Sequence, residues 1–135
     1  MIKLPTGVDI NNLIDDLRFF SWEASEILIY YSKVLKDSGS ESDILKNDDH
    51  SNPVTIADLK VNDLIIRRIN EKYQNIDWEI LSEENVKNSN DSFHNKSEWI
   101  WILDPLDGTK DFIQGTCNYA MHLALCYQQR SYLGV

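Results

Sequence analysis

The sequence predicts an α+β fold in which a layer of two helices packs on an antiparallel sheet. Two observations support it: residues 10–35 and 56–73 carry apolar side chains at helical spacing, and short apolar runs follow in the second half of the chain. The chain has 135 residues, which is enough to bury one core and is the usual size of one domain. We therefore expect a single domain over residues 1–135.

The first helix is expected over residues 10–35. Its apolar side chains recur at alternating steps of three and four, as on one face of a helix. They are Ile10, Leu13, Leu17, Phe20, Ala24, Ile27, Tyr31 and Leu35. Small polar residues around Gly39 then favour a loop that continues to Asn52, and we expect this loop to be mobile.

The second helix is expected over residues 56–73. Pro53 disfavours a helical conformation of the residue before it, and Thr55 is a good N-cap. Five apolar residues share one face of this helix: Ala57, Val61, Leu64, Ile65 and Ile69. The two helices together form the predicted helical layer.

The first two strands are expected at residues 78–81 and 99–103. The first run is short, aromatic and apolar. The second run is apolar without interruption, which indicates a strand that is covered on both faces and ends at Asp104. Between them, residues 85–97 are almost entirely polar and favour an exposed excursion.

Two further strands are expected at residues 119–127 and 132–135, joined by a hairpin turn at residues 128–131. The last strand continues to Val135 without a terminal polar segment. Because domains seldom finish in mid-strand, we expect this chain to be the N-terminal portion of a longer protein.

Composition and charge narrow the class of protein. The net charge of −9 repels the phosphate backbone, so a nucleic acid polymer is not an expected partner. The apolar runs are far shorter than the ~20 residues of a transmembrane helix, and the start of the chain lacks the apolar region of a signal peptide. We expect a cytoplasmic protein without a transmembrane segment. Cys117 and Cys126 lack CxxC spacing, so we expect buried thiols rather than a disulfide or a zinc site.

Acidic side chains follow the first two predicted strands. Glu83 and Glu84 come just after the first, and Asp104 and Asp107 come after the second. Strand pairing can bring all four carboxylates to one edge of the sheet, where the Leu106 carbonyl adds another oxygen. Hard oxygen ligands in such a cluster are what Mg²⁺ prefers.

Each motif alone has a simpler explanation. Asp-Pro and Asp-Gly are common turn formers, and an isolated Glu-Glu pair is usually solvated. Turn chemistry explains less well why both motifs follow apolar strands and why the hydroxyl of Thr109 stands next to the second acidic pair. The combination favours a metal-dependent active site.

Three segments resemble, in order and spacing, the signature of the inositol monophosphatase superfamily. They are residues 52–58 (Asn-Pro-Val-Thr-Ile-Ala-Asp), 82–84 (Ser-Glu-Glu) and 101–109 (Trp-Ile-Leu-Asp-Pro-Leu-Asp-Gly-Thr). The resemblance spans essentially the whole chain. It implies a Mg²⁺-dependent, lithium-sensitive phosphatase, and it implies that the chain is the first part of a layered αβαβα fold.

The resemblance also implies a metal site. Glu83, Asp104 and the carbonyl of Leu106 would hold one Mg²⁺, and Asp104 and Asp107 would hold a second. Glu84 would steady these ligands from outside. A complete enzyme of this kind is expected to use two or three ions.

The catalytic residues implied by the resemblance are Asp58, Glu83 and Thr109. Thr109, oriented by Asp58, and Glu83 would activate the attacking water, while the backbone amides of Gly108 and Thr109 would bind the substrate phosphate. Two plainer roles stay open. Asp58 is also suited to complement the helix dipole, and Thr109 is suited to cap a turn.

The residues after this motif point to a branch of the superfamily. Lys110-Asp111-Phe112 and Leu81-Ser82-Glu83-Glu84 resemble the 3′(2′),5′-bisphosphate nucleotidases of the CysQ type, which act in sulfur assimilation. The implied substrate, a small phosphorylated molecule, is adenosine 3′,5′-bisphosphate, hydrolysed to AMP and phosphate. The alternatives are an inositol or sugar monophosphatase of the same superfamily and a non-catalytic acidic metal-binding domain.

The chain departs from its relatives in two places. The loop before Pro53 is longer, which leaves open what Lys46, Asp48 and Asp49 do. A further metal-ligating Asp of relatives, in a Trp-Asp-x-Ala segment of their C-terminal half, has no counterpart among these residues. We therefore expect the isolated chain to bind Mg²⁺ weakly and to have little or no activity. Relatives form monomers or homodimers, so a homodimer stays open.

The histidines have no spacing typical of metal ligands. We expect His50, His94 and His122 to be surface or core residues instead.

Overall fold

The computed structural model of the chain describes residues 2–38, 45–46, 55–87 and 97–135. The expected loop up to Asn52 and the polar excursion at residues 85–97 lie mostly outside these described residues, and so do His50 and His94. None of the helices in the described ranges combines the length and apolar character that crossing a membrane requires.

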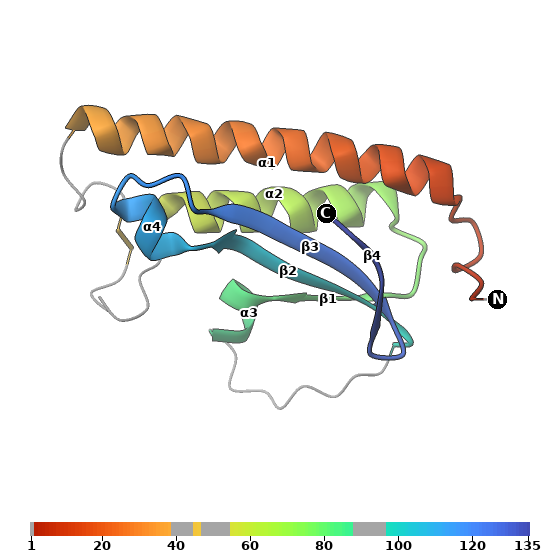
Figure 1. Cartoon of the computed structure of the whole chain (residues 1–135). Helices are drawn as coiled ribbons and strands as arrows, with labels where there is room; N and C mark the ends of the chain where they lie inside the picture. Colours follow the sequence, from red (N-terminus) through yellow and green to blue (C-terminus); the bar gives the residue numbers. More distant parts are fainter. Residues whose placement is uncertain (1, 39–44, 47–54, 88–96) are drawn as a thin grey trace.

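The predicted α+β class and its layer of two helices are confirmed. Helix α1 (Ile10–Ser38) and helix α2 (Ile56–Lys72) lie side by side on one face of a sheet (Figure 1). Two short helices, α3 (Glu83–Lys87) and α4 (Thr109–Ile113), lie at one end of that sheet. Glu83 and Glu84 thus begin a helical turn.

The sheet is mixed, whereas an antiparallel sheet was expected. The expectation is wrong at one edge of the sheet, where two strands are parallel. Its strands stand in the order of the chain: β1 (Glu79–Ser82), β2 (Trp99–Asp107), β3 (Ala120–Tyr127) and β4 (Arg130–Gly134). Neighbouring strands are antiparallel from β2 to β4, whereas β1 and β2 are parallel. Parallel strands need a connection of about a dozen residues or more, and residues 83–98 provide it.

Strand β2 is longer than predicted and less covered. It continues past Asp104 to Asp107, although its pairing with β3 becomes irregular between these two residues. Pro105 lies in this interval and has no backbone N–H to donate to the ladder, which accounts for the irregularity. One face is also partly open, because Ile102 is 45% exposed. The expected end at Asp104 and full coverage on both faces are therefore wrong.

The hairpin between β3 and β4 is tighter than predicted. Tyr127 pairs with Arg130, so the turn consists of Gln128 and Gln129 alone. Both have positive φ, 45° and 65°, as a two-residue turn matched to the strand twist requires. Of the two cysteines, Cys126 is buried as expected, whereas Cys117 is exposed.

The core lies between the helical layer and β2 and β3. Trp101 and Leu103 of β2 are 0% and 1% exposed, and they belong to the same buried cluster as Leu13 of α1 and Ile65 of α2. Trp101 also meets the ring of Trp78 edge to face, with centroids 5.3 Å apart. This packing holds β2 against the helices, so its position relative to the start of α2 is set by the core.

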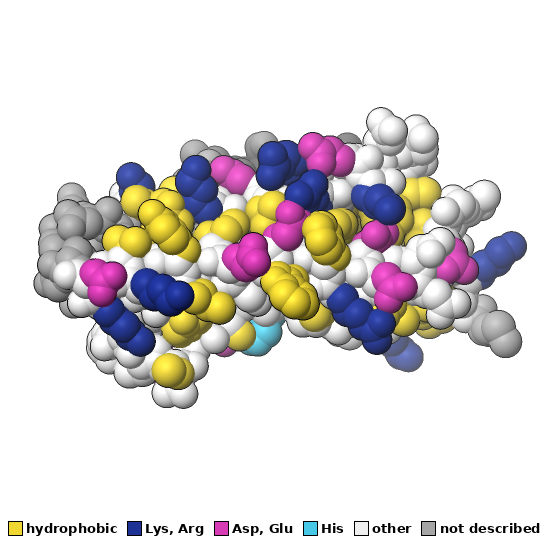
Figure 2. Space-filling view, turned by 90° about the horizontal axis from the view of Figure 1, so that it is seen from above, with side chains coloured by type: hydrophobic (Ala, Val, Ile, Leu, Met, Phe, Trp, Pro, Cys, Tyr) yellow, Lys and Arg dark blue, Asp and Glu magenta, His cyan; other side chains and the backbone are white. Residues whose placement is uncertain are grey.

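The outer face of α1 carries apolar side chains that the core does not use. Figure 2 shows them among Lys, Arg, Asp and Glu side chains. The large ones are Phe19, Trp22, Ile29 and Tyr30, which are 50–71% exposed. They lie off the face defined by the predicted apolar pattern, so that pattern marks the buried stripe of α1 correctly.

Candidate active site

The parallel pairing of β1 and β2 determines where the acidic residues meet. Ser82, at the end of β1, is the register partner of Leu103 in β2. The next residues of the two strands are Glu83 and Asp104. Because both strands run in the same direction, Glu83 follows the end of β1 beside Asp104, which lies within β2.

Glu83 and Asp104 form a carboxyl pair. The pKa of Asp104 is raised to about 6, mainly by partial burial and then by the negative charge of Glu83 and a hydrogen bond with it, while the hydrogen bond from the Leu106 amide opposes the rise. Two neighbouring carboxyl groups favour the protonated form of Asp104, and a bound cation would remove that preference. The negative charge of Asp107 acts on Asp104 in the same direction.

A tight turn links Asp104 to Thr109 through Leu106. The backbone N–H of Leu106 donates to Oδ1 of Asp104 at 3.2 Å, and its carbonyl accepts from Oγ1 of Thr109 at 2.9 Å. Gly108 then opens α4 with a φ of 80°, a conformation that favours glycine. A Cβ at Gly108 would lie 2.4 Å from the carbonyl oxygen of Asn118, so the turn leaves no room for another residue.

Asp58 and Thr109 come together as predicted. The Thr109 hydroxyl has a single proton, which it donates either to the Leu106 carbonyl or to Oδ1 of Asp58 at 3.3 Å. Oδ2 of Asp58 accepts from the backbone N–H of Thr55 at 2.8 Å and from its hydroxyl at 2.5 Å. Asp58 is only 2% exposed. Burial raises its pKa, and the hydrogen bonds from Thr55 and Thr109 oppose that rise.

The carboxylate of Asp58 has a different partner on each oxygen. Asp58 and Thr55 form a capping box at the start of α2, which is the plainer, structural role. The other oxygen of the carboxylate faces the Thr109 hydroxyl. Thr109 is the first residue of α4, and Gly108 is the N-cap. Of the two plainer roles open for Thr109, an N-cap is excluded, whereas a turn hydroxyl agrees with its contact to the Leu106 carbonyl.

Asp107 stands apart from the pair. Its carboxylate is 3.8 Å from Nδ1 of His122, and both side chains are 61% exposed. His122 pairs with Asp104 across β2 and β3. The sequence shows no signal for this contact, because it depends on strand register; His122 is a surface residue as predicted, but one that borders the site.

Glu84 is buried, whereas the loop residues of interest are exposed or lie outside the described residues. Glu84 is 4% exposed, so a solvated Glu-Glu pair does not describe it, whereas Glu83 is exposed. Lys46 is exposed, while Asp48 and Asp49 lie outside the described residues.

The donor set suits a hard divalent cation but is not yet closed around one. Within residues 2–38, 45–46, 55–87 and 97–135, no three His, Cys, Asp or Glu side chains converge closely enough to hold a metal ion. The pair of Glu83 and Asp104 nevertheless offers oxygens whose crowding a cation would relieve. The backbone N–H of Leu106 binds Asp104, while the carbonyl of Leu106 accepts from the Thr109 hydroxyl. Asp107 would have to turn from His122 to join them.

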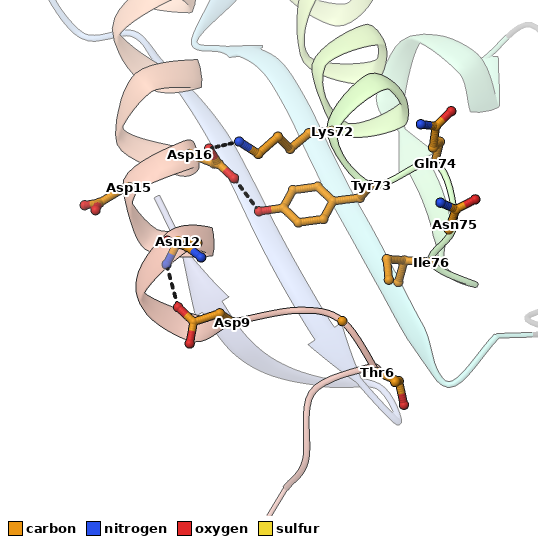
Figure 3. A pocket seen from close by; sticks show the side chains of 11 residues that line it. Thr6, Asp9, Asn12, Asp15, Asp16, Lys72, Tyr73, Gln74, Asn75 and Ile76 are labelled. Atoms are coloured by element: carbon orange, nitrogen blue, oxygen red, sulfur yellow. Dashed lines mark hydrogen bonds and ion pairs between the residues drawn. The ribbon is translucent and has the colours of Figure 1, made fainter.

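A polar cavity of about 560 Å³ lies at the opposite end of α2 and contains none of these residues. Figure 3 shows that its side chains bind each other: Asp16 of α1 accepts from the Tyr73 hydroxyl at 2.6 Å and pairs with Lys72 at 3.3 Å. Burial and Asp16 raise the pKa of Tyr73. This cavity joins α1 to the end of α2 and is distinct from the candidate site.

One further polar residue near the site gave no signal in the sequence. Asn62 on α2 is 5% exposed and accepts a hydrogen bond from the hydroxyl of Ser82. From the sequence it is one polar residue among several on α2, because its partner lies 20 residues further along the chain.

Known proteins match the chain over most of its length. The profile of the inositol monophosphatase family matches residues 18–135. The chain is 35% identical over 93 residues to the 3′(2′),5′-bisphosphate nucleotidase CysQ of Haemophilus influenzae, covering 67% of this chain and 32% of that protein. It is 35% identical over 94 residues to the chloroplastic bifunctional phosphatase IMPL2 of Arabidopsis thaliana, covering 69% of this chain and 25% of that protein.

The same fold occurs in solved structures. The IMPase of Thermotoga maritima superimposes with a TM-score of 0.69 at 23% identity, over 92% of this chain and 43% of that one. The fold described above therefore corresponds to part of that structure. The chain spans between a quarter and a third of the length of the two curated relatives named above.

Proposed function

The chain belongs to the inositol monophosphatase family, and from this premise we propose that it forms the metal-binding and water-activating part of a phosphatase. The proposed reaction is hydrolysis of the 3′-phosphate of adenosine 3′,5′-bisphosphate to AMP and phosphate. The observation that carries the proposal is the carboxyl pair of Glu83 and Asp104, which Leu106 connects to the hydroxyl of Thr109.

The proposed metal ligands are Glu83, Asp104 and the carbonyl of Leu106 for one Mg²⁺, and Asp104 and Asp107 for a second. Bound cations of this kind lower the pKa of a water molecule and stabilise the charge on a leaving oxygen. Near or below pH 6, metal binding would displace the proton of Asp104 and so be coupled to proton release. Glu84, which is buried and directly follows Glu83 in the chain, would restrict the movement of this pair.

The proposed water-activating group is Thr109 together with Glu83. When Asp58 accepts the proton of the Thr109 hydroxyl, the lone pairs of Oγ1 are left to accept a hydrogen bond from a water molecule. Asp58 can hold this orientation because two hydrogen bonds from Thr55 fix its other oxygen. The backbone amides of Gly108 and Thr109 are the proposed contacts of the substrate phosphate.

The choice of a nucleotide substrate rests on resemblance. The relative from Haemophilus influenzae is named for this substrate class, and Lys110-Asp111-Phe112 resembles the corresponding residues of such nucleotidases. Phe112 is fully buried against Tyr119, and Asp111 accepts from the Thr116 hydroxyl at 2.6 Å, so Lys110 is the exposed member of the three. We also propose a cytoplasmic location and a role in sulfur assimilation.

A substrate panel tests the proposal. Phosphate release is measured with Mg²⁺ from adenosine 3′,5′-bisphosphate, an inositol monophosphate and a sugar monophosphate, for a longer protein in which this chain is joined to the C-terminal half of a relative, with and without Asp104→Asn. We expect turnover of the longer protein to be fastest for the bisphosphate, and a fall of roughly 100-fold or more in Asp104→Asn because an electrostatic contribution to the transition state is lost. Asp15→Asn on α1 is the matched control, since Asp15 is an exposed acid that pairs with exposed Arg18 at 2.9 Å.

Each result decides between the candidate functions. Faster release from the inositol or sugar ester would support the alternative substrate class. Equal rates for wild type and Asp104→Asn would rule out both phosphatase functions, and Mg²⁺ binding without turnover of any ester would support a non-catalytic metal-binding domain.

A further inference from the structure

Helix α2 presents two buried polar residues to the candidate site from one face. Asp58 and Asn62 are four residues apart, one turn of the helix, and are 2% and 5% exposed. Asp58 contacts Thr109, which follows β2, while Asn62 contacts Ser82, which ends β1. The proposed function uses the first contact and has no role for the second.

The side chain of Asn62 binds on both sides of the Glu83–Glu84 pair. Its Oδ1 accepts from the hydroxyl of Ser82, which directly precedes Glu83 and is 1% exposed. Its Nδ2 lies 3.5 Å from Oδ1 of Asn85, the residue after Glu84, and also 3.5 Å from Oδ1 of Asp63. A single amide group thus contacts the chain before and after the two glutamates.

The chemistry of an amide suits this place. Burying a polar group is unfavourable unless it is hydrogen-bonded, and the neighbouring positions Val61 and Ile65 are apolar and fully buried. A carboxylate in place of Asn62 could also accept from Ser82, but it would add negative charge close to Glu83 and Asp104. A neutral amide holds both partners without raising that repulsion.

We propose that Asn62 is a positioning residue of the metal site, acting through Ser82 and Asn85 to fix where Glu83 meets Asp104. The identity of the metal in this inference rests on the proposed function. The constraint that Asn62 places on residues 82–85 does not, so the two parts are measured separately.

The variant Asn62→Ala tests the inference with two readouts. Amide hydrogen exchange of residues 82–85 in the metal-free chain should quicken by about tenfold or more, because local opening becomes easier. Mg²⁺ affinity, measured by calorimetry, should fall by about 10- to 100-fold, as is typical when a residue that orients a metal ligand is removed. Ser82→Ala should produce the same two changes, and the double variant should add little to either.

Two controls separate positioning from general destabilisation. Asn70→Ala makes the same substitution at an exposed position of α2 and should leave both readouts unchanged. Val61→Ala opens a cavity beside Asn62, so it should lower the melting temperature while leaving the Mg²⁺ affinity of the folded chain near the wild-type value.

The inference is overturned if exchange at residues 82–85 stays at the wild-type rate in both Asn62→Ala and Ser82→Ala. Fully additive effects of the two substitutions would also overturn it, because Asn62 would then not act through Ser82. If Asn62→Ala does not fold, Ser82→Ala removes the same hydrogen bond and decides alone. Absence of Mg²⁺ binding by the wild-type chain would refute the proposed metal site, and the exchange rates would still decide the role of Asn62.

Discussion

The carboxylate of Asp58 and the hydroxyl of Thr109 lie 3.3 Å apart although 51 positions separate them in the chain. The contact joins the start of α2 to the start of α4, and it exists only because the core holds β2 against the helical layer. Four predictions follow from the geometry around it.

Replacement of Thr109 by valine removes the hydroxyl and keeps the shape of the side chain. We expect phosphate release to fall by about 100-fold or more, the scale of a lost proton-transfer group, with little change in Mg²⁺ affinity. Steady-state rates and calorimetry check this. Thr116→Val is the matched control, because the Thr116 hydroxyl binds Asp111 instead. Equal losses in both variants would count against a specific role of Thr109.

Replacement of Asp58 by alanine should cost stability as well as activity. The N–H and hydroxyl of Thr55, which is fully buried, would lose their acceptor, and a buried unsatisfied donor costs about 1–3 kcal/mol. Urea unfolding measures this loss. Glu71→Ala removes an exposed acid of the same helix and should change stability by less than about 0.5 kcal/mol. An Asp58→Ala chain as stable as that control would contradict the capping box.

The metal-free chain should lose stability as pH rises through the titration of Asp104. The pKa of this carboxyl is raised from 3.8 to about 6 in the folded chain. The folded state therefore binds the proton more tightly than the unfolded state. The stability from protonated Asp104 is fully present below about pH 4 and is lost as pH rises past about 6. Asp58, whose pKa is also raised, acts in the same direction.

The contribution of Asp104 is isolated with Asp104→Asn, which resembles the protonated carboxyl at every pH. Melting temperatures are measured in a chelator between pH 4 and 7.5. We expect the melting temperature of the variant to rise relative to that of the wild type between pH 4 and 6. Above pH 6 it should remain the higher of the two. Added Mg²⁺ should remove this difference by stabilising the wild type only. If the melting temperatures of the two proteins changed with pH in parallel, ionisation of the carboxyl pair would not destabilise the folded chain.

Gly108→Ala should destabilise the chain more than Gly115→Ala. Both glycines have positive φ, 80° and 75°, so both alanines carry the cost of a left-handed conformation, about 1 kcal/mol or more. Only at Gly108 would the added Cβ also clash with the Asn118 carbonyl, whereas nothing lies within 4 Å at Gly115. Thermal unfolding of the two variants checks the order, and equal losses would mean that the turn can shift to admit a Cβ.

The helices were predictable because local periodicity determines which of their faces is buried, as the buried stripe of α1 shows. The direction of β1 relative to β2 was not, because it depends on how the connection between them packs. The path of β2 through Pro105 also differed from expectation, since tertiary pairing outweighed local turn chemistry.

Parts of the candidate site were predictable for a related reason. Glu83 and Asp104 could be found because each directly follows an apolar run of the sequence, although their meeting depends on the parallel pairing of β1 and β2. Asn62 and His122 could not, because each contacts the site through partners that are remote in sequence. A buried amide and a surface histidine leave no local pattern that distinguishes them.

The one-turn spacing of Asp58 and Asn62 also bears on which changes of length α2 can accept. One residue inserted between them would rotate one side chain against the other by about 100° and shift it by about 1.5 Å along the helix axis. Either Thr109 or Ser82 would then lose its partner. Insertions and deletions should therefore be tolerated beyond Lys72, where α2 has ended. In the first turns of α2 they should disrupt these contacts, even next to exposed positions that tolerate substitution.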